Sequence, residues 1–479
     1  MPLAQRERRT DGGTAMGSVV VCGGGMVGSL TAMMLAADGH DVTVLEADPV
    51  GPGEIGAGAW GSWDRKGVAQ FHQPHSVFPK FRHVLDAELP GLNERLAGAG
   101  CAEWDVLAAL PPTLTDTTSR PDDADRVMLT GRRPVMESVV AAAAGQAAGV
   151  TVRRGVRVRE LVAGTPARPG VPHVTGVVTA DGEHLGADLV IDASGRRTCS
   201  GDWLAALGAR PPYTESEDRG FVYYSRYFTG PRPAQYGPAL MPVGSISYLT
   251  LVSDNDTWSV TLYARSGDAP LKALRNTDAF TRVATACPLA AHWVDATPIS
   301  DVVAMAGIVD SYRRFVVDGE PVVTGFAAVG DAWASTNPSA GRGITIGVVQ
   351  AQALRQGFAA HGGDPVAFAH AYDGLTEERA APFHRVQVGM DSWRIAEMAA
   401  FADGTEPPAP DPAFTPLEVA SAVDADAFRG LLDIILCLAQ PEEVMARPAV
   451  AAAVRAAAGV TPQPFPGPDR AQLLALIAG

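Results

Sequence analysis

The sequence lacks any uninterrupted apolar run close to the roughly 20 residues that a membrane-crossing helix requires. Its longest apolar stretches are broken by Asp, Arg or Gly, so a membrane partner is not expected and we predict a soluble protein. Basic residues precede Val19–Val21 as in a secretory signal, but Gly23–Gly25 break the run at once. This interruption favours a strand over a signal peptide.

Cysteine is scarce in this chain of 479 residues. The five cysteines are widely scattered and form no CxxC pair. This pattern predicts reduced thiols in a cytoplasmic protein rather than a disulfide or zinc framework. His72 and His75 lie near each other in the sequence, but no third ligand is found close by, so no metal site is expected.

Basic residues are also in deficit, with 38 Lys and Arg against 53 Asp and Glu, which gives a formal net charge of −15. Nucleic acid is bound mainly by clustered cations that neutralise phosphates, so this balance argues against such a partner. The chain shows no internal repeat and no convincing arrangement of nucleophile and base.

What is present begins with a short β-branched run, Ser18–Cys22, followed by glycines and then by good helix formers over Met26–Ala37. A second strand is predicted to end at Glu46. The glycines Gly23, Gly25 and Gly28 allow a tight turn, close approach of the backbone to a pyrophosphate, and close packing of helix on strand.

This βαβ unit predicts a dinucleotide site. The amino terminus of the helix directs free N–H groups and a positive dipole end at phosphates. Glu46 stands where a carboxylate accepts hydrogen bonds from an adenosine ribose, which favours NAD or FAD over NADP. A glycine-rich turn without a ligand is the alternative.

A second glycine-rich element lies about three hundred residues later, where a short strand runs into Gly330-Asp331, a loop, and a helix from Gly343. The Asp331 carboxylate can accept a hydrogen bond from a ribityl hydroxyl. The loop glycines let the main chain approach a flat ring, and the helix amino terminus favours negative charge on a reduced flavin. Together the two elements predict that the chain binds FAD.

The second element resembles the Gly-Asp motif of the aromatic-hydroxylase superfamily of FAD monooxygenases, in particular its squalene-epoxidase-like and polyketide-epoxidase branch. Three further segments share the resemblance: Arg65–Gln70 with His75, Gly131–Pro134, and Asp188–Arg197 followed by Trp203-Leu204. The resemblance spans about residues 18 to 360. It implies that Arg133 lies by the pyrophosphate or ribityl chain, and that Gly341–Ile344 edge the isoalloxazine.

The resemblance and the two motifs give one set of expected FAD contacts. These are Gly23, Gly25, Met26, Val27, Gly28, Glu46, Ala47, Arg65, Arg133, Asp331, Gly341, Gly343 and Ile344.

Aromatic residues of a predicted second sheet are the candidates for a substrate wall, although such a stripe is also typical of ordinary core. The candidates are Tyr223, Tyr227, Tyr248, Trp258, Tyr263 and Pro338. Catalysis is expected to be driven by the flavin, with His75, Arg226 and Tyr224 as candidate assisting residues. Arg226 could anchor a carboxylate or oxyanion, the alternative being a surface ion pair. For His75 the alternative is a structural hydrogen bond.

The resemblance implies a monooxygenase of secondary metabolism that transfers one oxygen atom of O2, through a flavin C4a-hydroperoxide, to a hydrophobic olefinic or aromatic molecule. The alternatives are a dehydrogenase or reductase of the prenyl-reductase type and a flavin halogenase. Lys66 and Lys80 are candidates for the lysine that flavin halogenases use, but the WxWxIP signature of that class is missing. Asp192-Ala193-Ser194-Gly195 departs from the Asp-Gly motif of NADPH-using hydroxylases. NAD(P)H used directly and electrons from a separate flavin reductase therefore both stay open.

The expected fold is α/β, with a Rossmann-like FAD-binding domain, an inserted mixed β-sheet substrate domain and a helical carboxy-terminal region, in a monomer or homodimer. Residues 1–17 are expected to form a flexible leader. The discontinuous FAD-binding domain is assigned to 18–210, including an insertion over 65–130, and to 318–362. The substrate domain is assigned to 211–317, and the helical region to 363–479.

Overall fold

The structure, a computed structural model, describes residues 17–108, 110–111, 113–217, 220–409, 415–460 and 464–479. Apart from Gly17, the predicted leader lies outside this set. Among the described residues, no helix is long and apolar enough to cross a membrane.

A five-stranded parallel sheet forms the centre of the larger body, in the order β21-β10-β1-β2-β6. Its strands are β1 (Ser18–Cys22), β2 (Asp41–Glu46), β6 (Val150–Arg154), β10 (Leu189–Asp192) and β21 (Phe326–Ala328). They are short apolar runs, as expected for parallel strands that helices cover. Strand β21 comes from far along the chain and pairs with β10. Because β1 and β21 run parallel in this sheet, the glycine-rich segments that follow them begin at the same, carboxyl-terminal edge of the sheet.

Helices α1 (Met26–Ala37), α5 (Arg133–Gln146) and α8 (Gly343–His361) pack together beside this sheet. Smaller helices around them are α2 (Ala59–Ser62), α3 (Pro79–Glu88), α4 (Leu92–Gly98) and α6 (Ser200–Ala206). Two antiparallel three-stranded sheets flank the body. One is β3 (Pro74–Val77), β5 (Val127–Arg132) and β4 (Ala102–Asp105); the other is β7 (Val158–Ala163), β8 (Val174–Thr179) and β9 (His184–Gly186).

The β-branched pattern from Val152 to Val162 predicts one strand, but this stretch is divided between two strands in the structure. Gly155 breaks it with a φ of +73°, in the left-handed region that suits glycine. As a result β6 joins the parallel sheet and β7 joins the outer hairpin.

The second large sheet is antiparallel and has the order β13-β14-β15-β12-β16, with β17 also pairing β12. Its strands are β12 (Phe221–Thr229), β13 (Leu240–Val243), β14 (Ile246–Val252), β15 (Thr257–Arg265), β16 (Thr297–Pro298) and β17 (Val303–Met305). Helix α7 (Thr277–Thr285) covers one face, together with the 3-10 turn η4 (Ala291–Val294).

The aromatic and β-branched residues of Tyr312–Val317 predict a further strand of this second sheet, but the segment lies elsewhere. β18 (Asp310–Arg314) pairs β11 (Tyr213–Glu217) and β22 (Ala334–Ser335), whereas β19 (Val316–Val317) pairs β20 (Glu320–Pro321). The Tyr312 ring packs edge-on against Trp333, with centroids 5.0 Å apart. The Tyr312 ring therefore packs where β18 meets the segment that follows β21.

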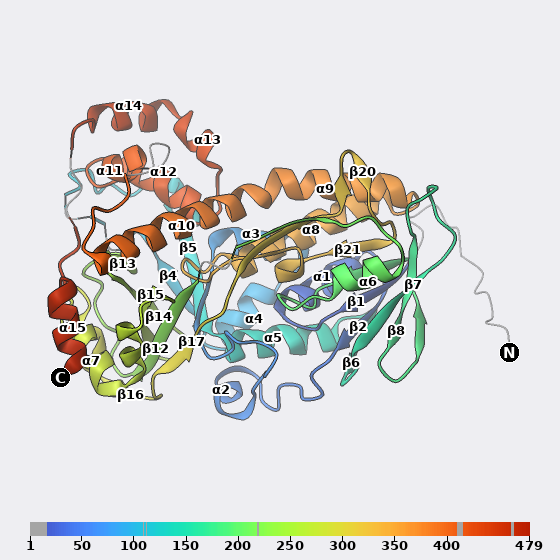
Figure 1. Cartoon of the computed structure of the whole chain (residues 1–479), viewed down its shortest axis with the longest axis horizontal. Helices are drawn as coiled ribbons and strands as arrows, with labels where there is room; N and C mark the ends of the chain where they lie inside the picture. Colours follow the sequence, from blue (N-terminus) through green and yellow to red (C-terminus); the bar gives the residue numbers. More distant parts are fainter. Residues whose placement is uncertain (1–16, 109, 112, 218–219, 410–414, 461–463) are drawn as a thin grey trace.

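The carboxy-terminal region is helical, as predicted. Its helices are α9 (Pro365–Arg379), α10 (Ala381–Asp403), α11 (Thr415–Ser421), α12 (Ala425–Ile435), α13 (Pro441–Met445), α14 (Pro448–Ala456) and α15 (Arg470–Ala478). In Figure 1 the long α10 runs between the group α11–α14 and the strands of the second sheet. The Rossmann-like parallel sheet, the additional antiparallel sheets and the terminal helices together confirm the predicted α/β fold class.

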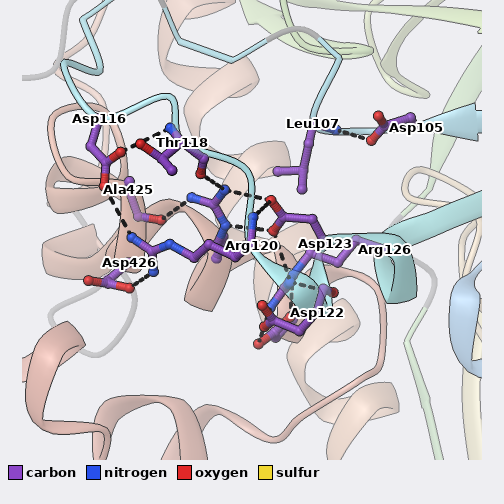
Figure 2. A network of polar contacts seen from close by, with 12 residues as sticks. Asp105, Leu107, Asp116, Thr118, Arg120, Asp122, Asp123, Arg126, Ala425 and Asp426 are labelled. Atoms are coloured by element: carbon purple, nitrogen blue, oxygen red, sulfur yellow. Dashed lines mark hydrogen bonds and ion pairs between the residues drawn. The ribbon is translucent and has the colours of Figure 1, made fainter.

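A buried ion network fastens the terminal helices to the 3-10 turn η2 (Pro121–Arg126), just before β5 (Figure 2). Arg126 and Arg429, each about 5% exposed, donate to Asp433 and Asp123 respectively, with the closest N–O pairs at 2.9 and 2.7 Å. Arg120 adds an ion pair with Asp426, nearer the surface. The network holds α12 against η2.

Candidate functional site

One cavity of about 2490 Å³ connects the larger body, the second sheet and the carboxy-terminal helices. Its walls include the turn after β1, the end of β2, the loop from Gly330 to Ile344, and strands β13 and β14. Helices α10, α11 and α12 also contribute. Small-molecule sites typically measure about 300–1,000 Å³, so the volume exceeds the need of a single ligand.

The turn from β1 into α1 is shaped by glycines. A Cβ on Gly23, whose φ is +120°, would lie 2.3 Å from the Ala193 carbonyl oxygen. A Cβ on Gly28 would lie 2.0 Å from the carbonyl oxygen of Gly23. Gly25 caps α1 without any side-chain hydrogen bond, and both Gly25 and Met26 line the cavity. The helix amino terminus thus presents its first N–H groups to the cavity.

Four buried charged residues lie beside this turn. Glu46 accepts hydrogen bonds from the Gly24 amide at 2.8 Å and from an Arg65 Nη at 2.6 Å. Arg65 also pairs with Glu137 of α5, which in turn accepts from Arg133. Two cations and two carboxylates therefore balance, and each is less than 8% exposed.

Glu46 consequently has a second role beyond the predicted contact with a ribose. Its other oxygen accepts from the Asp48 amide at 2.8 Å, so three protein donors already occupy the carboxylate. Because the residue also lines the cavity, a ribose would share a carboxylate that already holds the glycine turn in place.

His75 stands next to Arg133 at the cavity wall. Its Nδ1 lies 2.8 Å from the Gln73 carbonyl oxygen, which can only accept, so Nδ1 carries the proton. Its Nε2 is then free to accept from an Arg133 Nη at 3.4 Å. Burial and the Arg133 charge lower the His75 pKa to about 3, so the ring is neutral at physiological pH. His75 thus orients Arg133, and proton exchange near neutral pH is disfavoured.

Asp331 follows β21 and lines the cavity near the start of α8, where its Oδ1 would lie 3.9 Å from a Cβ placed on Gly343. No hydrogen bond or ion pair joins it to any described residue. Burial raises the pKa of this carboxyl, against the opposing charges of Arg196 and Arg133. A partly buried carboxylate without protein donors fits hydroxyl groups of a ligand, as predicted for a ribityl chain.

All of the predicted FAD contacts line this one cavity. The two glycine-rich elements touch each other there, because a Cβ on Gly330 would meet the Val27 side chain at 3.4 Å. The residues are Gly23, Gly25, Met26, Val27, Gly28, Glu46, Ala47, Arg65, Arg133, Asp331, Gly341, Gly343 and Ile344.

The predicted aromatic wall needs correction, because only Tyr263 and Pro338 of the substrate candidates line the cavity. Side chains alternate between the two faces of a strand. Tyr224 and Tyr248 share the face that packs on α7, where the Tyr248 hydroxyl donates to the Val283 carbonyl at 2.6 Å. Trp258 lies on that face as well, and its indole N–H donates to the Trp293 carbonyl at 2.9 Å.

The remaining candidates are also engaged away from the cavity wall. Tyr223 donates to the Asn337 side chain at 3.3 Å, and the Tyr227 ring packs on Trp60 with centroids 4.8 Å apart. Arg226 donates to the Ser300 carbonyl and to Thr281 of α7, both at 3.3 Å. Neither Arg226 nor Tyr224 lines the cavity, so the structure does not bring these two to the site.

The Asp192–Gly195 segment forms a closed turn at the cavity wall. Asp192, fully buried, accepts from the Ser194 amide at 2.9 Å, from the Ser194 hydroxyl at 2.6 Å, and from Thr198. Its carboxylate is therefore satisfied within the turn. Ala193–Arg197 form part of the cavity lining.

Sequence reasoning missed the contribution of α10. Gln387, Asp391 and Arg394 are 1%, 3% and 7% exposed, and all three line the cavity. Their spacing of four and then three residues places them on one helix face. The signal available in the sequence was the helical spacing of these three polar residues within a segment that contains both polar and apolar residues.

Exposed apolar side chains also line the cavity. Tyr236, Phe401, Val423 and Val460 are between 36% and 62% exposed, and come from the loop before β13 and from the carboxy-terminal region. The half of the cavity that lies between the second sheet and the carboxy-terminal helices, called the apolar chamber below, has mostly apolar walls. Leu249, Leu251 and Trp104 are among the residues that line it.

Comparison with known proteins gives one family match. Residues 18–113 match the model of the FAD dependent oxidoreductase family. One curated relative, Protein Rv3254 of Mycobacterium tuberculosis (strain ATCC 25618 / H37Rv), is 29% identical over 179 residues. That match covers 36% of this chain and spans only 37% of the relative.

Solved structures share the fold across most of the chain. PqsL of Pseudomonas aeruginosa, a probable FAD-dependent monooxygenase, is 17% identical with a TM-score of 0.60, over 81% of this chain and 97% of its own. The flavin-dependent brominase Bmp2 is 15% identical with a TM-score of 0.57, over 91% and 97%. The anhydrotetracycline hydroxylase OxyS of Streptomyces rimosus is 17% identical with a TM-score of 0.54, over 88% and 76%. The family match and the shared fold support an FAD-dependent oxidoreductase.

Proposed function

We propose that the protein is an FAD-dependent monooxygenase that inserts one oxygen atom of O2 into a hydrophobic olefinic or aromatic small molecule. The observation that carries the proposal is a single large cavity with two different halves. One half collects the two glycine-rich elements, and the other is a mostly apolar chamber beside them. Bound FAD would supply the electron transfer and oxygen activation that side chains lack.

The residues present fit FAD. The amino terminus of α1 and the Arg133 guanidinium offer positive charge to a pyrophosphate, and Asp331 offers acceptors to a ribityl chain. Main chain from Gly341 to Ile344 leaves room for a flat ring, since Gly341 has a φ of +75° and presents no side chain.

The apolar chamber is where these residues would hold a substrate. Leu249, Leu251 and Tyr263 of the second sheet line it together with residues of α10. Such walls exclude water and orient an apolar molecule, which is the main task of the protein in this class of reaction.

Halogenation is the weaker alternative. By the resemblance drawn from the sequence, a halogenase needs a lysine near the flavin and the substrate. Among the described residues no lysine lines the cavity, and neither Lys66 nor Lys80 does so. A dehydrogenase or reductase remains the second candidate, because it would use the same FAD half.

The source of electrons is part of the proposal. Because Asp192 is fully buried and satisfied within its own turn, we infer that electrons come through a separate flavin reductase rather than from NAD(P)H bound beside this turn. NADH or NADPH alone should bleach the yellow protein only slowly. Fast bleaching stimulated by an added aromatic compound would indicate a self-sufficient hydroxylase.

Oxygen labelling tests the reaction itself. The FAD-loaded protein, reduced through an added flavin reductase and NADH, is exposed to oxygen-18 gas with a panel of apolar phenols and alkenes. A monooxygenase yields products that carry one oxygen-18 atom by mass spectrometry. Oxidised products without the label would favour the dehydrogenase, and a protein that neither is yellow nor takes up FAD would contradict both.

A further inference from the structure

A polar cluster on α10 interrupts the apolar chamber. Asp391 lies on the cavity wall with 3% of its surface exposed. Gln387, one turn earlier, is 1% exposed and also lines the cavity. Apolar residues such as Leu249, Leu251 and Trp104 line the same half, so Asp391 and Gln387 are buried polar groups that would meet a polar end of a substrate there.

Ser339 joins this cluster to the FAD half. Its hydroxyl donates to one Asp391 oxygen, while the Gln387 amide donates to the other at 2.9 Å and to the Ser339 oxygen at 2.7 Å. Ser339 belongs to the loop between β22 and α8, next to Pro338 and two residues before Gly341. The carboxyl group of Asp391 therefore stands at the boundary between the expected flavin ring and the apolar chamber.

The described residues do not satisfy every polar atom of this cluster. No cation forms an ion pair with Asp391 within the described residues, and the Gln387 side-chain oxygen is buried without a hydrogen-bond partner. Burial raises the Asp391 pKa to about 7, although the hydrogen bonds from Ser339 and Gln387 lower it. A buried acceptor without a donor is costly, so the unpartnered Gln387 oxygen indicates that a ligand completes the cluster, while each Asp391 oxygen already accepts one hydrogen bond.

The electrostatic surroundings come from several elements. The titratable and charged groups that interact with Asp391 or stand beside it are Asp310 of β18, Tyr223 of β12, Tyr263 of β15, Arg342 before α8, and Arg394 on its own helix. Asp310 raises the Asp391 pKa and Arg342 lowers it. Arg394 is occupied by Glu397, the Ser247 hydroxyl and the carbonyls of Gly244 and Ile246.

We propose that Asp391, positioned by Ser339 and Gln387, binds the reacting end of the substrate through a hydroxyl or amino hydrogen and accepts that proton during the reaction. The inference rests on the proposed function and narrows its substrate class to apolar phenols, enols or anilines. The substrate O–H or N–H bond breaks, and its electron pair stays on the oxygen or nitrogen, where it enriches the adjoining ring or double bond. The proton forms an O–H bond on Asp391 and returns to the product oxygen or nitrogen afterwards.

A purely structural Asp391 that only holds the Pro338–Gly341 loop is the rival reading. Thermal unfolding of the FAD-loaded protein separates the two. Asp391→Asn removes a buried charge that has no ion-pair partner, so its Tm at pH 8 should exceed that of the wild type. The matched control Asp254→Asn breaks a buried pair with Arg132, whose closest N–O distance is 2.5 Å, and should lower the Tm. A lowered Tm for both variants would overturn the proposal.

Binding of 4-nitrophenol is the second readout, because this phenol absorbs differently from its phenolate. At pH 8 the wild-type protein should bind it in equilibrium dialysis with the protonated absorbance. Asp391→Asn should bind at least about tenfold more weakly, since it replaces a charge-assisted hydrogen bond. Equal affinity and equal absorbance for the two proteins, or no binding to yellow wild-type protein, would contradict the inference.

Ser339→Ala provides a second variant should Asp391→Asn fail to fold. It keeps the carboxylate but removes the serine donor, so it should bind 4-nitrophenol while changing the pH at which the bound phenol ionises. The flavin absorbance of each preparation distinguishes the two levels of failure. Colourless protein counts against the proposed function, whereas yellow variants that bind the probe like the wild type count against Asp391 alone.

Discussion

At the scale of single residues, the glycines of the first turn serve two different purposes. Gly23 and Gly28 leave no room for a Cβ within the protein, whereas a Cβ on Gly25 would find only an Arg65 nitrogen at 3.7 Å. Gly25 has an extended φ of −76° that alanine also adopts. Its lack of a side chain therefore matters to whatever fills the cavity.

Alanine substitutions should separate these purposes. We expect Gly25→Ala to keep the Tm of the FAD-free protein and to weaken FAD binding by at least about tenfold, because its methyl group would stand where the pyrophosphate approaches the backbone. Gly28→Ala should lower the Tm, since its Cβ would meet the Gly23 carbonyl at 2.0 Å. Flavin fluorescence titration and thermal melts measure both, and unchanged FAD affinity in Gly25→Ala would argue against a pyrophosphate at this turn.

His75 makes a testable contribution to acid sensitivity. Its folded pKa of about 3 lies below the ordinary value near 6.5, so the unfolded chain binds more protons between these limits. Stability associated with His75 is thus present above about pH 6.5 and is lost as the pH falls toward 3. Between pH 7 and pH 5, the unfolding free energy of the wild type should fall by about 2 kcal/mol more than that of His75→Gln. Urea titrations at the two pH values give this difference, and parallel losses would contradict a depressed pKa.

Prediction from sequence succeeded best where a function is concentrated in a few neighbouring residues. Gly23–Gly28 and Gly330–Ile344 carry their conformational demands locally, so their convergence on one cavity could be anticipated. Asp391 could not be, because its significance comes from Ser339 and from burial, neither of which is visible in the residues next to it.

At the scale of elements, the sequence predicts strands over Phe221–Phe228, Ile246–Ser253 and Thr257–Arg265, close to the bounds of β12, β14 and β15, but it does not assign their faces. The pairing of Tyr224 with Leu262 and of Leu262 with Tyr248 places all three on the α7 side. Tyr263, one residue along, is on the cavity side. Both faces of this sheet are buried, so polar alternation gives no sign of which side is which.

The contact between η2 and α12 is the element-scale feature that a mutation can test. Asp433, 6% exposed, accepts from Arg126 at 2.9 Å and from Arg447 at 2.5 Å. Asp433→Asn should lower the unfolding free energy by about 3 kcal/mol, because it leaves buried guanidinium groups short of charge.

Asp426→Asn is the matched control on the same helix. Asp426 is 40% exposed and its partner Arg120 is 29% exposed, so the loss of this pair should cost less than about 1 kcal/mol. Chemical denaturation monitored by tryptophan fluorescence compares the two variants. Equal losses would show that the network of Figure 2 does not depend on burial.

At the scale of the whole molecule, the cavity is built from parts that lie far apart in the sequence. The FAD half is drawn from two motifs, whereas the apolar half needs β13, β14, β4 and helices α10 to α12. The buried ion pair of Arg132 with Asp254 joins the end of β5 to the loop between β14 and β15 of the second sheet. Such an assembly has no signature in any one segment, which explains why the role of the carboxy-terminal hundred residues could not be read from their composition.

The five cysteines differ in exposure, and the one exposed thiol can report whether the cavity is filled. Four thiols are buried, and burial raises the pKa of Cys22 and Cys287, of Cys101 to about 12 and of Cys437 to about 11, so they should resist alkylation. Cys199 alone is exposed, and it lines the cavity. A colorimetric disulfide reagent should therefore titrate one sulfhydryl in the native protein and five after denaturation, and the rate at that single position would follow the filling of the chamber without any engineered label.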